Sequence, residues 1–199
     1  QPSTAPVEND TGPKPYRWVM LAGLWFIYFC FSLIVVSTAP LVQPIVEDLG
    51  LSLSAMGSLM GAWPLLYIAA AIPAGAFLDR FGVRRALLIA AVIMATSAAL
   101  RATASSYLSM FVAIAMFGLG GPLISVGAPK LISAWFSGKE RGFAMGAYIT
   151  GPSMGGIAAL TLTNSYFMPL TDHDWRKVLL IYAAITLVAG FVWFLVTRP

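Results

Sequence analysis

Long uncharged apolar runs dominate this sequence, and they restrict its fold more than any other feature. The run from Trp18 to Ala39 holds 22 residues without a charge, and the run from Leu51 to Leu78 holds 28. A helix that crosses a hydrocarbon core about 30 Å thick needs roughly 20 apolar residues, because each residue rises about 1.5 Å. Both runs therefore predict membrane-spanning helices, and the front of the second run is expected to lie outside the membrane.

Four further spans follow from the same test of length. Within 86–129 the single charge is Arg101, and the residues 104–106 that follow it can form a turn between two helices. The uncharged runs 142–171 and 178–197 add one span each. The sequence therefore predicts an all-α membrane protein with six transmembrane helices.

The composition supports this class and excludes others. Hydrophobic residues make up 59% of the chain and charged residues 10%, with a mean hydropathy of +0.82, whereas soluble domains carry about 25% charged residues. One cysteine and one histidine exclude a disulfide scaffold and the clustered ligands of a zinc site, so we expect no metal. We also expect no cofactor. The net charge of +4 is divided among small groups between apolar runs, unlike the basic patch of a nucleic-acid-binding protein, so we expect no nucleic-acid partner.

The ends of the chain and the basic residues indicate an orientation. Residues 1–16 contain four prolines and no apolar periodicity, which is typical of a disordered segment, and residues 17–199 form the predicted bundle. Cytoplasmic loops carry an excess of lysine and arginine. One predicted side of the membrane holds Lys14, Arg17, Arg80, Arg84, Arg85, Lys139, Arg141 and Arg198, and the other holds Arg101, Arg176 and Lys177. We therefore expect both termini in the cytoplasm. We also expect the protein to lie in the lipid bilayer of a bacterial inner (plasma) membrane.

A motif rich in glycine and charge follows the second predicted span. It reads Gly75-Ala-Phe-Leu-Asp79-Arg80-Phe-Gly82-Val-Arg84-Arg85. This resembles the signature of the major facilitator superfamily of transporters, and every defining position matches between spans two and three. A second element in span five, Gly151-Pro152-Ser-Met-Gly155-Gly156, is similar to another motif of the same family. The resemblance covers residues 18–198 and implies one half of a major facilitator superfamily fold.

The loop around Asp79 predicts a conformational latch. Gly82 provides a tight turn, and the Asp79 carboxylate is placed to accept backbone N–H groups from the N-terminus of a partner helix, an interaction that a small rigid-body shift breaks. We expect Arg84 or Arg85 to meet Glu140 across the cytoplasmic face. The alternative is a solvated loop that only sets orientation. The predicted latch residues are Gly75, Asp79, Arg80, Gly82, Arg84, Arg85, Glu140 and Arg141.

The fifth predicted span is rich in glycine and predicts close helix packing. Gly151 and Gly155 lie four residues apart on one helix face, where a second helix can approach because no side chain intervenes. Pro152 removes one backbone donor and is expected to bend the helix. Ordinary packing without a mechanistic bend is the alternative. The predicted packing and bending residues are Gly146, Gly151, Pro152, Gly155 and Gly156.

Ionisable side chains are scarce within the predicted spans, so the candidate substrate path is mostly neutral. Charged groups inside a membrane are candidates for function, and here only Arg101 and Lys130 qualify. Arg101 is expected to reach the outer headgroups with its flexible stem. Lys130 is either an interfacial anchor or a cavity residue that favours an anion. By resemblance the path residues are Tyr28, Ser32, Trp63, Tyr67, Lys130, Tyr148 and Ser153, with packing against neighbours as the alternative for the aromatic members.

The sequence holds one six-span half, whereas members of this family have two halves with the substrate site between them. We expect the second six-helix half from the same polypeptide, a separate chain or a second copy. The predicted function is secondary active transport of a small solute by rocker-switch alternating access, with an organic or inorganic anion preferred over neutral solutes. A non-transporting assembly or docking subunit is the alternative. An enzyme is not expected, because Gly138-Lys139-Glu140 lacks the remaining residues of a phosphate loop.

Overall fold

The computed structural model describes residues 16–197, which fold almost entirely into helices. In chain order the elements are α1 (Tyr16–Ser37), α2 (Val42–Leu49), α3 (Leu53–Ala102), α4 (Tyr107–Trp135), α5 (Gly138–Leu162), a π-helix η1 (Thr163–Phe167), α6 (Met168–Leu170) and α7 (Trp175–Val196). Of the predicted disordered segment, residues 1–15 lie outside the described part of the chain, and Tyr16 is the first residue of α1.

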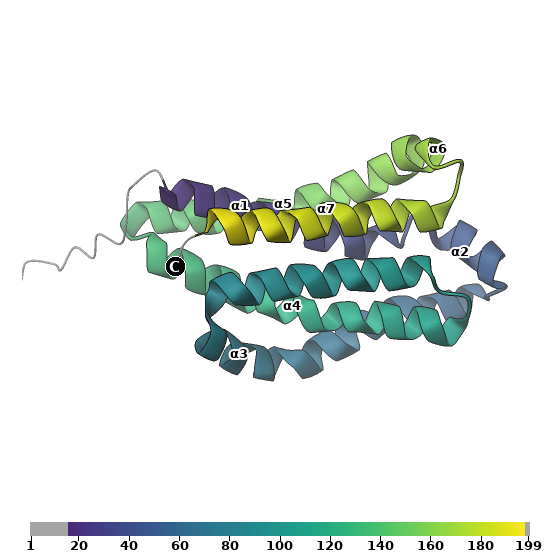
Figure 1. Cartoon of the computed structure of the whole chain (residues 1–199), viewed down its shortest axis with the longest axis horizontal. Helices are drawn as coiled ribbons and strands as arrows, with labels where there is room; N and C mark the ends of the chain where they lie inside the picture. The colour runs from purple at the N-terminus through teal and green to yellow at the C-terminus, as the bar shows by residue number, and fades with distance from the viewer. Residues whose placement is uncertain (1–15, 198–199) are drawn as a thin grey trace, which may run out of the picture.

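Helix α3 contains a turn at Gly82 and supplies two membrane-crossing segments. Gly82 has φ 77° and ψ 157°, a conformation that glycine enters readily because it has no Cβ. The chain reverses its direction there, and the first arm (53–81) and second arm (83–102) both extend away from this turn (Figure 1). The predicted turn between spans two and three therefore lies at Gly82, inside α3.

The predicted six-helix architecture is confirmed. Within the described residues, four helices are long and apolar enough to cross a membrane, namely α1, α3, α4 and α7. Helix α3 counts twice because of its two arms. Helix α5 supplies the remaining span. It has 25 residues, but its glycines and hydroxyl side chains lower its mean hydropathy, so it is not among those four helices.

The helices form one bundle whose two ends differ (Figure 1). Helix α1 packs against α5 and α7, and α3 packs against α4 and α7. The Tyr16 hydroxyl donates to the Val196 carbonyl at 2.7 Å, and the Trp193 indole N–H donates to the Arg84 carbonyl at 3.0 Å. The start of α1, the end of α7 and the Gly82 turn therefore share one end of the bundle, called the Gly82 end below. The opposite end, with α2 and α6, is called the α2 end (Figure 1).

Glycines allow the backbones of neighbouring helices to touch. A Cβ at Gly155 of α5 would lie only 2.2 Å from the Phe29 carbonyl oxygen of α1, and one at Gly118 of α4 would lie 2.3 Å from the Trp63 carbonyl oxygen of α3. No side chain fits in either place, so glycine is required for these close approaches. The contacts bring α5 close to α1 and α4 close to the first arm of α3, and these helices carry the candidate path residues.

Candidate substrate path and latch

Asp79 stands near the end of the first arm of α3, at the Gly82 end. Its Oδ1 pairs with Nζ of Lys130 from α4. The Asp79 side chain is 73% exposed and that of Lys130 is 49% exposed, so solvent screens the pair in this bundle. The structure places Lys130 against Asp79 rather than among the predicted path residues, because Lys130 lies near the end of α4 that returns to the Gly82 turn.

Arg84 joins the second arm of α3 to the last turns of α7. Its Nη2 donates to the Phe194 carbonyl oxygen at 2.6 Å, and its guanidinium carbon lies 4.1 Å from the centre of the Phe194 ring. The last carbonyls of a helix carry partial negative charge, which favours a cation there. Arg84 and the hydrogen bond from Trp193 together hold the start of the second arm against α7.

The expected contact between Glu140 and Arg84 or Arg85 is absent from the structure. Glu140, in the first turn of α5, instead pairs with Arg17 of α1 at 2.7 Å. The prediction was wrong because α5 packs against α1 rather than against the start of the second arm, while the Arg84 guanidinium is held by α7.

The other predicted latch residues lie on the exterior of the Gly82 end. Arg80, Arg85 and Arg141 are exposed, and the Arg80 guanidinium lies 5.5 Å from the centre of the Phe81 ring. Nothing described lies within 4 Å of the place that a Cβ on Gly75 would take. Together with Asp79, these residues form a charged surface, called the charged Asp79 surface below. The open space beside Gly75 leaves room there for a further element.

Four predicted path residues and Phe31 are connected through ring contacts and form what we call the aromatic row: Tyr148, Tyr28, Phe31, Trp63 and Tyr67. The Tyr148 and Tyr28 rings stack 5.8 Å apart with 11° between their planes. Phe31 contacts Tyr28 at 5.8 Å and Trp63 at 6.2 Å, and Trp63 contacts Tyr67 at 6.0 Å. The row thus joins α5, α1 and the first arm of α3.

The aromatic row ends in a hydroxyl pair. Tyr67 Oη and Ser125 Oγ of α4 lie 2.7 Å apart, and both residues are half-buried. Phe31 was not predicted as a path residue because it has no polar group, although it follows Tyr28 by three residues and so shares its helix face. Spacing on α1 could have identified it. Of the predicted serines, Ser32 is buried and Ser153 is exposed, and neither belongs to the row.

The predicted glycines of span five differ in their surroundings. A Cβ on Gly151 would lie 2.8 Å from the Trp25 carbonyl oxygen, and one on Gly156 would lie 3.3 Å from Ser32 Oγ. Gly146 has nothing within 4 Å of that position. Pro152 lies inside α5. A π-helix follows α5 at 163–167, farther toward the α2 end, and makes that part of the span irregular.

Contrary to the prediction, Arg101 does not extend to the outer headgroups. Its side chain is only 2% exposed and packs inside the bundle. The guanidinium carbon lies 5.4 Å from the centre of the Phe117 ring of α4. The prediction was wrong because the second arm of α3 turns this position toward α4 and the end of α1, away from the exterior.

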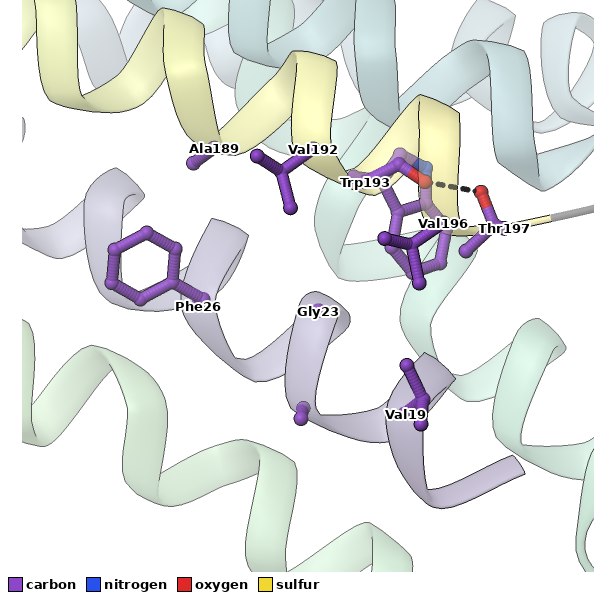
Figure 2. Close-up of a pocket in the computed structure, with 9 residues that line it drawn as sticks. Val19, Gly23, Phe26, Ala189, Val192, Trp193, Val196 and Thr197 are labelled. Atoms are coloured by element: carbon purple, nitrogen blue, oxygen red, sulfur yellow. Dashed lines mark hydrogen bonds between the residues drawn. The ribbon is translucent and has the colours of Figure 1, made fainter. Parts of the chain in front are cut away.

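A separate apolar pocket of about 280 Å³ lies between α1 and α7 (Figure 2). Figure 2 shows Val19, Gly23 and Phe26 of α1 facing Ala189 and Val192 of α7. Its only polar lining side chain, apart from the Trp193 indole, is that of Thr197, whose hydroxyl donates to the Trp193 carbonyl at 2.5 Å. None of the predicted path residues lines this pocket, and its surface suits an apolar group rather than a polar solute.

Comparison with known proteins identifies relatives of the whole bundle. The family model of the Major Facilitator Superfamily matches residues 24–199. The galacturonate transporter of Dickeya chrysanthemi is 29% identical over 90% of this chain and 51% of its own length. The probable anion transporter 3, chloroplastic, of Arabidopsis thaliana is 33% identical over 76% of this chain and 30% of its own length. The D-galactonate transporter of Escherichia coli is 27% identical over 77% and 35%, respectively.

A solved structure supports the same fold. The crystal structure of a bacterial homologue of the human lysosomal transporter Spinster, inward-facing and unoccupied, superposes with a TM-score of 0.83 at 22% identity. The match covers 94% of this chain and 44% of that one. The chain therefore spans about half, or less, of the length of these relatives.

Proposed function

The chain belongs to the Major Facilitator Superfamily, and we propose that it forms one six-helix half of a secondary transporter that carries a small anion. The aromatic row is the observation that carries this proposal. It joins three spans, and its three tyrosine hydroxyls, with Ser125, can donate to or accept from a polar solute. The galacturonate, galactonate and anion transporters among the relatives favour an anionic solute.

A second six-helix half is part of the proposal. On the first arm of α3, Leu65, Ile68 and Ile72 are 68%, 70% and 88% exposed, and their spacing of three and four places them on one helix face. The chain covers 51% of the Dickeya relative, which leaves room in such a protein for another bundle. We assign this face to the second half, against which the described bundle rocks so that the path opens to either side in turn.

The proposed orientation places the Gly82 end in the cytoplasm of a bacterial cell. Arg17, Arg80, Arg84 and Arg85 lie at this end, whereas Arg176 and Lys177 lie at the α2 end, where Arg176 pairs with Asp48 at 2.7 Å. An excess of arginine and lysine marks cytoplasmic loops. The charged Asp79 surface would then act as the latch against the second half.

Uptake into proteoliposomes tests the proposed function. The complete transporter that contains this bundle is reconstituted and supplied with galacturonate or with neutral galactose, with and without a pH gradient. We expect accumulation of the anion and little of the neutral sugar. Properly inserted protein that moves neither compound, nor any other small anion tested, would instead favour the non-transporting subunit.

Replacing Tyr67 with phenylalanine will weaken solute recognition modestly. The change removes one hydroxyl and its 2.7 Å contact with Ser125, and a single hydrogen bond contributes about 1 kcal/mol, or about fivefold in a binding constant. We therefore expect the half-saturation concentration for uptake to rise about fivefold. Tyr107→Phe is the matched control, because it also removes a hydroxyl contact with a serine, at 2.9 Å from Ser58, but outside the row. Equal effects of the two changes would count against the row as the path.

A further inference from the structure

Arg101 is a buried cation that the proposed latch and aromatic row do not use. Its Nη1 donates to Thr38 Oγ1 at 3.3 Å, while its Nε and Nη2 are buried and have no hydrogen-bond partner within residues 16–197. Arg101 also forms no ion pair with a carboxylate in this described part of the chain. Within residues 16–197, one whole edge of the guanidinium is therefore buried against atoms that accept no hydrogen bond from it.

Burying these unpartnered donors costs free energy. Buried polar groups are almost always hydrogen-bonded, and a charged group away from water is expensive unless it is paired. Two nearby helix ends reduce this cost, because Arg101 lies in the last turn of α3 and its partner Thr38 follows the last residue of α1. Their partial negative charge favours a cation. Neither end supplies an acceptor to Nε or Nη2.

The two unpartnered donors lie on the same edge of the guanidinium. Nε and Nη2 point their N–H groups in parallel, which matches the two oxygens of a carboxylate in a bidentate contact. We propose that this edge of Arg101 is a binding site for the carboxylate of the transported solute. The inference rests on the proposed anion transport and adds to it the residue that recognises the charge.

The site is adjacent to the aromatic row. The Phe117 ring lies against the Arg101 guanidinium on one side, and its centre is 5.0 Å from the Phe31 ring and 6.0 Å from the Trp63 ring. The Phe117 ring therefore contacts both the Arg101 guanidinium and two members of the row. Phe117 is fully buried in this structure, so in the proposed bound state it is displaced, the row holds the body of the solute and Arg101 binds its carboxylate.

A carboxylate could also come from a side chain in the remainder of the transporter, and the experiment distinguishes the two sources. Arg101→Gln and Arg101→Lys are made in the complete transporter, with Lys177→Gln as the control that removes an exposed positive charge at the α2 end. Galacturonate and galactose, which differ in the carboxylate, are the probes. Uptake kinetics and the thermal shift caused by each sugar are measured.

We expect Arg101→Gln to raise the half-saturation concentration for galacturonate at least about tenfold, because hydrogen bonds to charged groups are strong. The thermal shift caused by galacturonate should disappear, while the weak response to galactose stays unchanged. Arg101→Lys keeps the charge but not the paired donors. Its half-saturation concentration for galacturonate should therefore lie between those of the wild type and Arg101→Gln. Lys177→Gln should behave as the wild type.

Other results would overturn the site. If both Arg101 variants move galacturonate with the wild-type half-saturation concentration, Arg101 does not bind the solute, although the proposed function stands. Lower thermal stability with unchanged affinity would assign the edge to a carboxylate of the protein itself, and loss of folded protein in both variants would assign Arg101 to the fold. A wild type that neither binds nor moves any anion would reject the proposed function together with this site.

Discussion

Replacing Asp79 with asparagine will reduce solute flux about tenfold while leaving the amount of inserted protein unchanged. Asparagine has nearly the same size as aspartate but no charge, so the pair with Lys130 is lost without a steric conflict. The Asp79 side chain is largely exposed and that of Lys130 is about half exposed, so we expect the fold of this half not to depend on the pair. Initial uptake rates in proteoliposomes, divided by the amount of reconstituted protein, measure the effect.

The expected size of this loss separates two explanations. An exposed ion pair contributes at most about 1 kcal/mol, which corresponds to about fivefold in an equilibrium between two conformations. A tenfold effect corresponds to about 1.4 kcal/mol, so it requires a second interaction of Asp79, with the N-terminus of a helix in the second half. Lys130→Gln, which removes only the pair, should therefore cost a few-fold in flux and less than Asp79→Asn.

Asp172→Asn is the matched control for the loss of a carboxylate. Asp172 is 94% exposed and lies 4.0 Å from Lys177 in an ion pair at the opposite end of the bundle. Its φ of 55° suits asparagine, which tolerates this region, so the change should alter neither folding nor flux. Wild-type flux in Asp79→Asn, at normal expression, would contradict a latch and leave the solvated loop as the explanation.

The architecture was predictable from sequence because it depends on local and strongly periodic features. The length of a membrane-crossing helix is set by the bilayer, so the uncharged runs determined the number of spans. The positive φ at Gly82 lies where the motif predicted a turn. The aromatic residues Tyr28, Trp63, Tyr67 and Tyr148 were selected because polar groups stand out within apolar helices and because the family resemblance implies which spans border the path. The structure connects their rings, and their role in transport stays a prediction.

The partners of the charged side chains were not predictable in the same way. Glu140 pairs with Arg17, which is 123 residues away in the chain, and Lys130 reaches Asp79 across 51 residues. Such pairs depend on which helices become neighbours and how each is rotated, and the low amphipathicity of these apolar helices gives little information about rotation. Arg101 was misplaced for this reason, since its burial follows from the rotation of the second arm of α3.

Replacing Gly155 with alanine will destabilise the bundle, although alanine is normally the better helix residue. The added Cβ would lie 2.2 Å from the Phe29 carbonyl oxygen and 3.2 Å from the Leu33 nitrogen. These are backbone atoms of α1, so the conflict cannot be relieved by a side-chain rotation and the two helices must separate. Overpacking of this kind costs about 1–3 kcal/mol, or roughly 2–12 °C in Tm for a bundle of this size. Thermal unfolding in detergent measures the change.

Gly146→Ala is the control within the same helix. Nothing described lies within 4 Å of the added Cβ, and alanine in place of glycine favours a helix by up to about 1 kcal/mol. The Tm should therefore stay the same or rise slightly. The opposite signs expected for two identical substitutions, nine residues apart in one helix, separate backbone contact from helix propensity. Equal Tm values for the two variants would mean that α1 and α5 do not approach as closely as the Gly155 contact requires, and the positions of Tyr28 and Tyr148 in the aromatic row would lose their support.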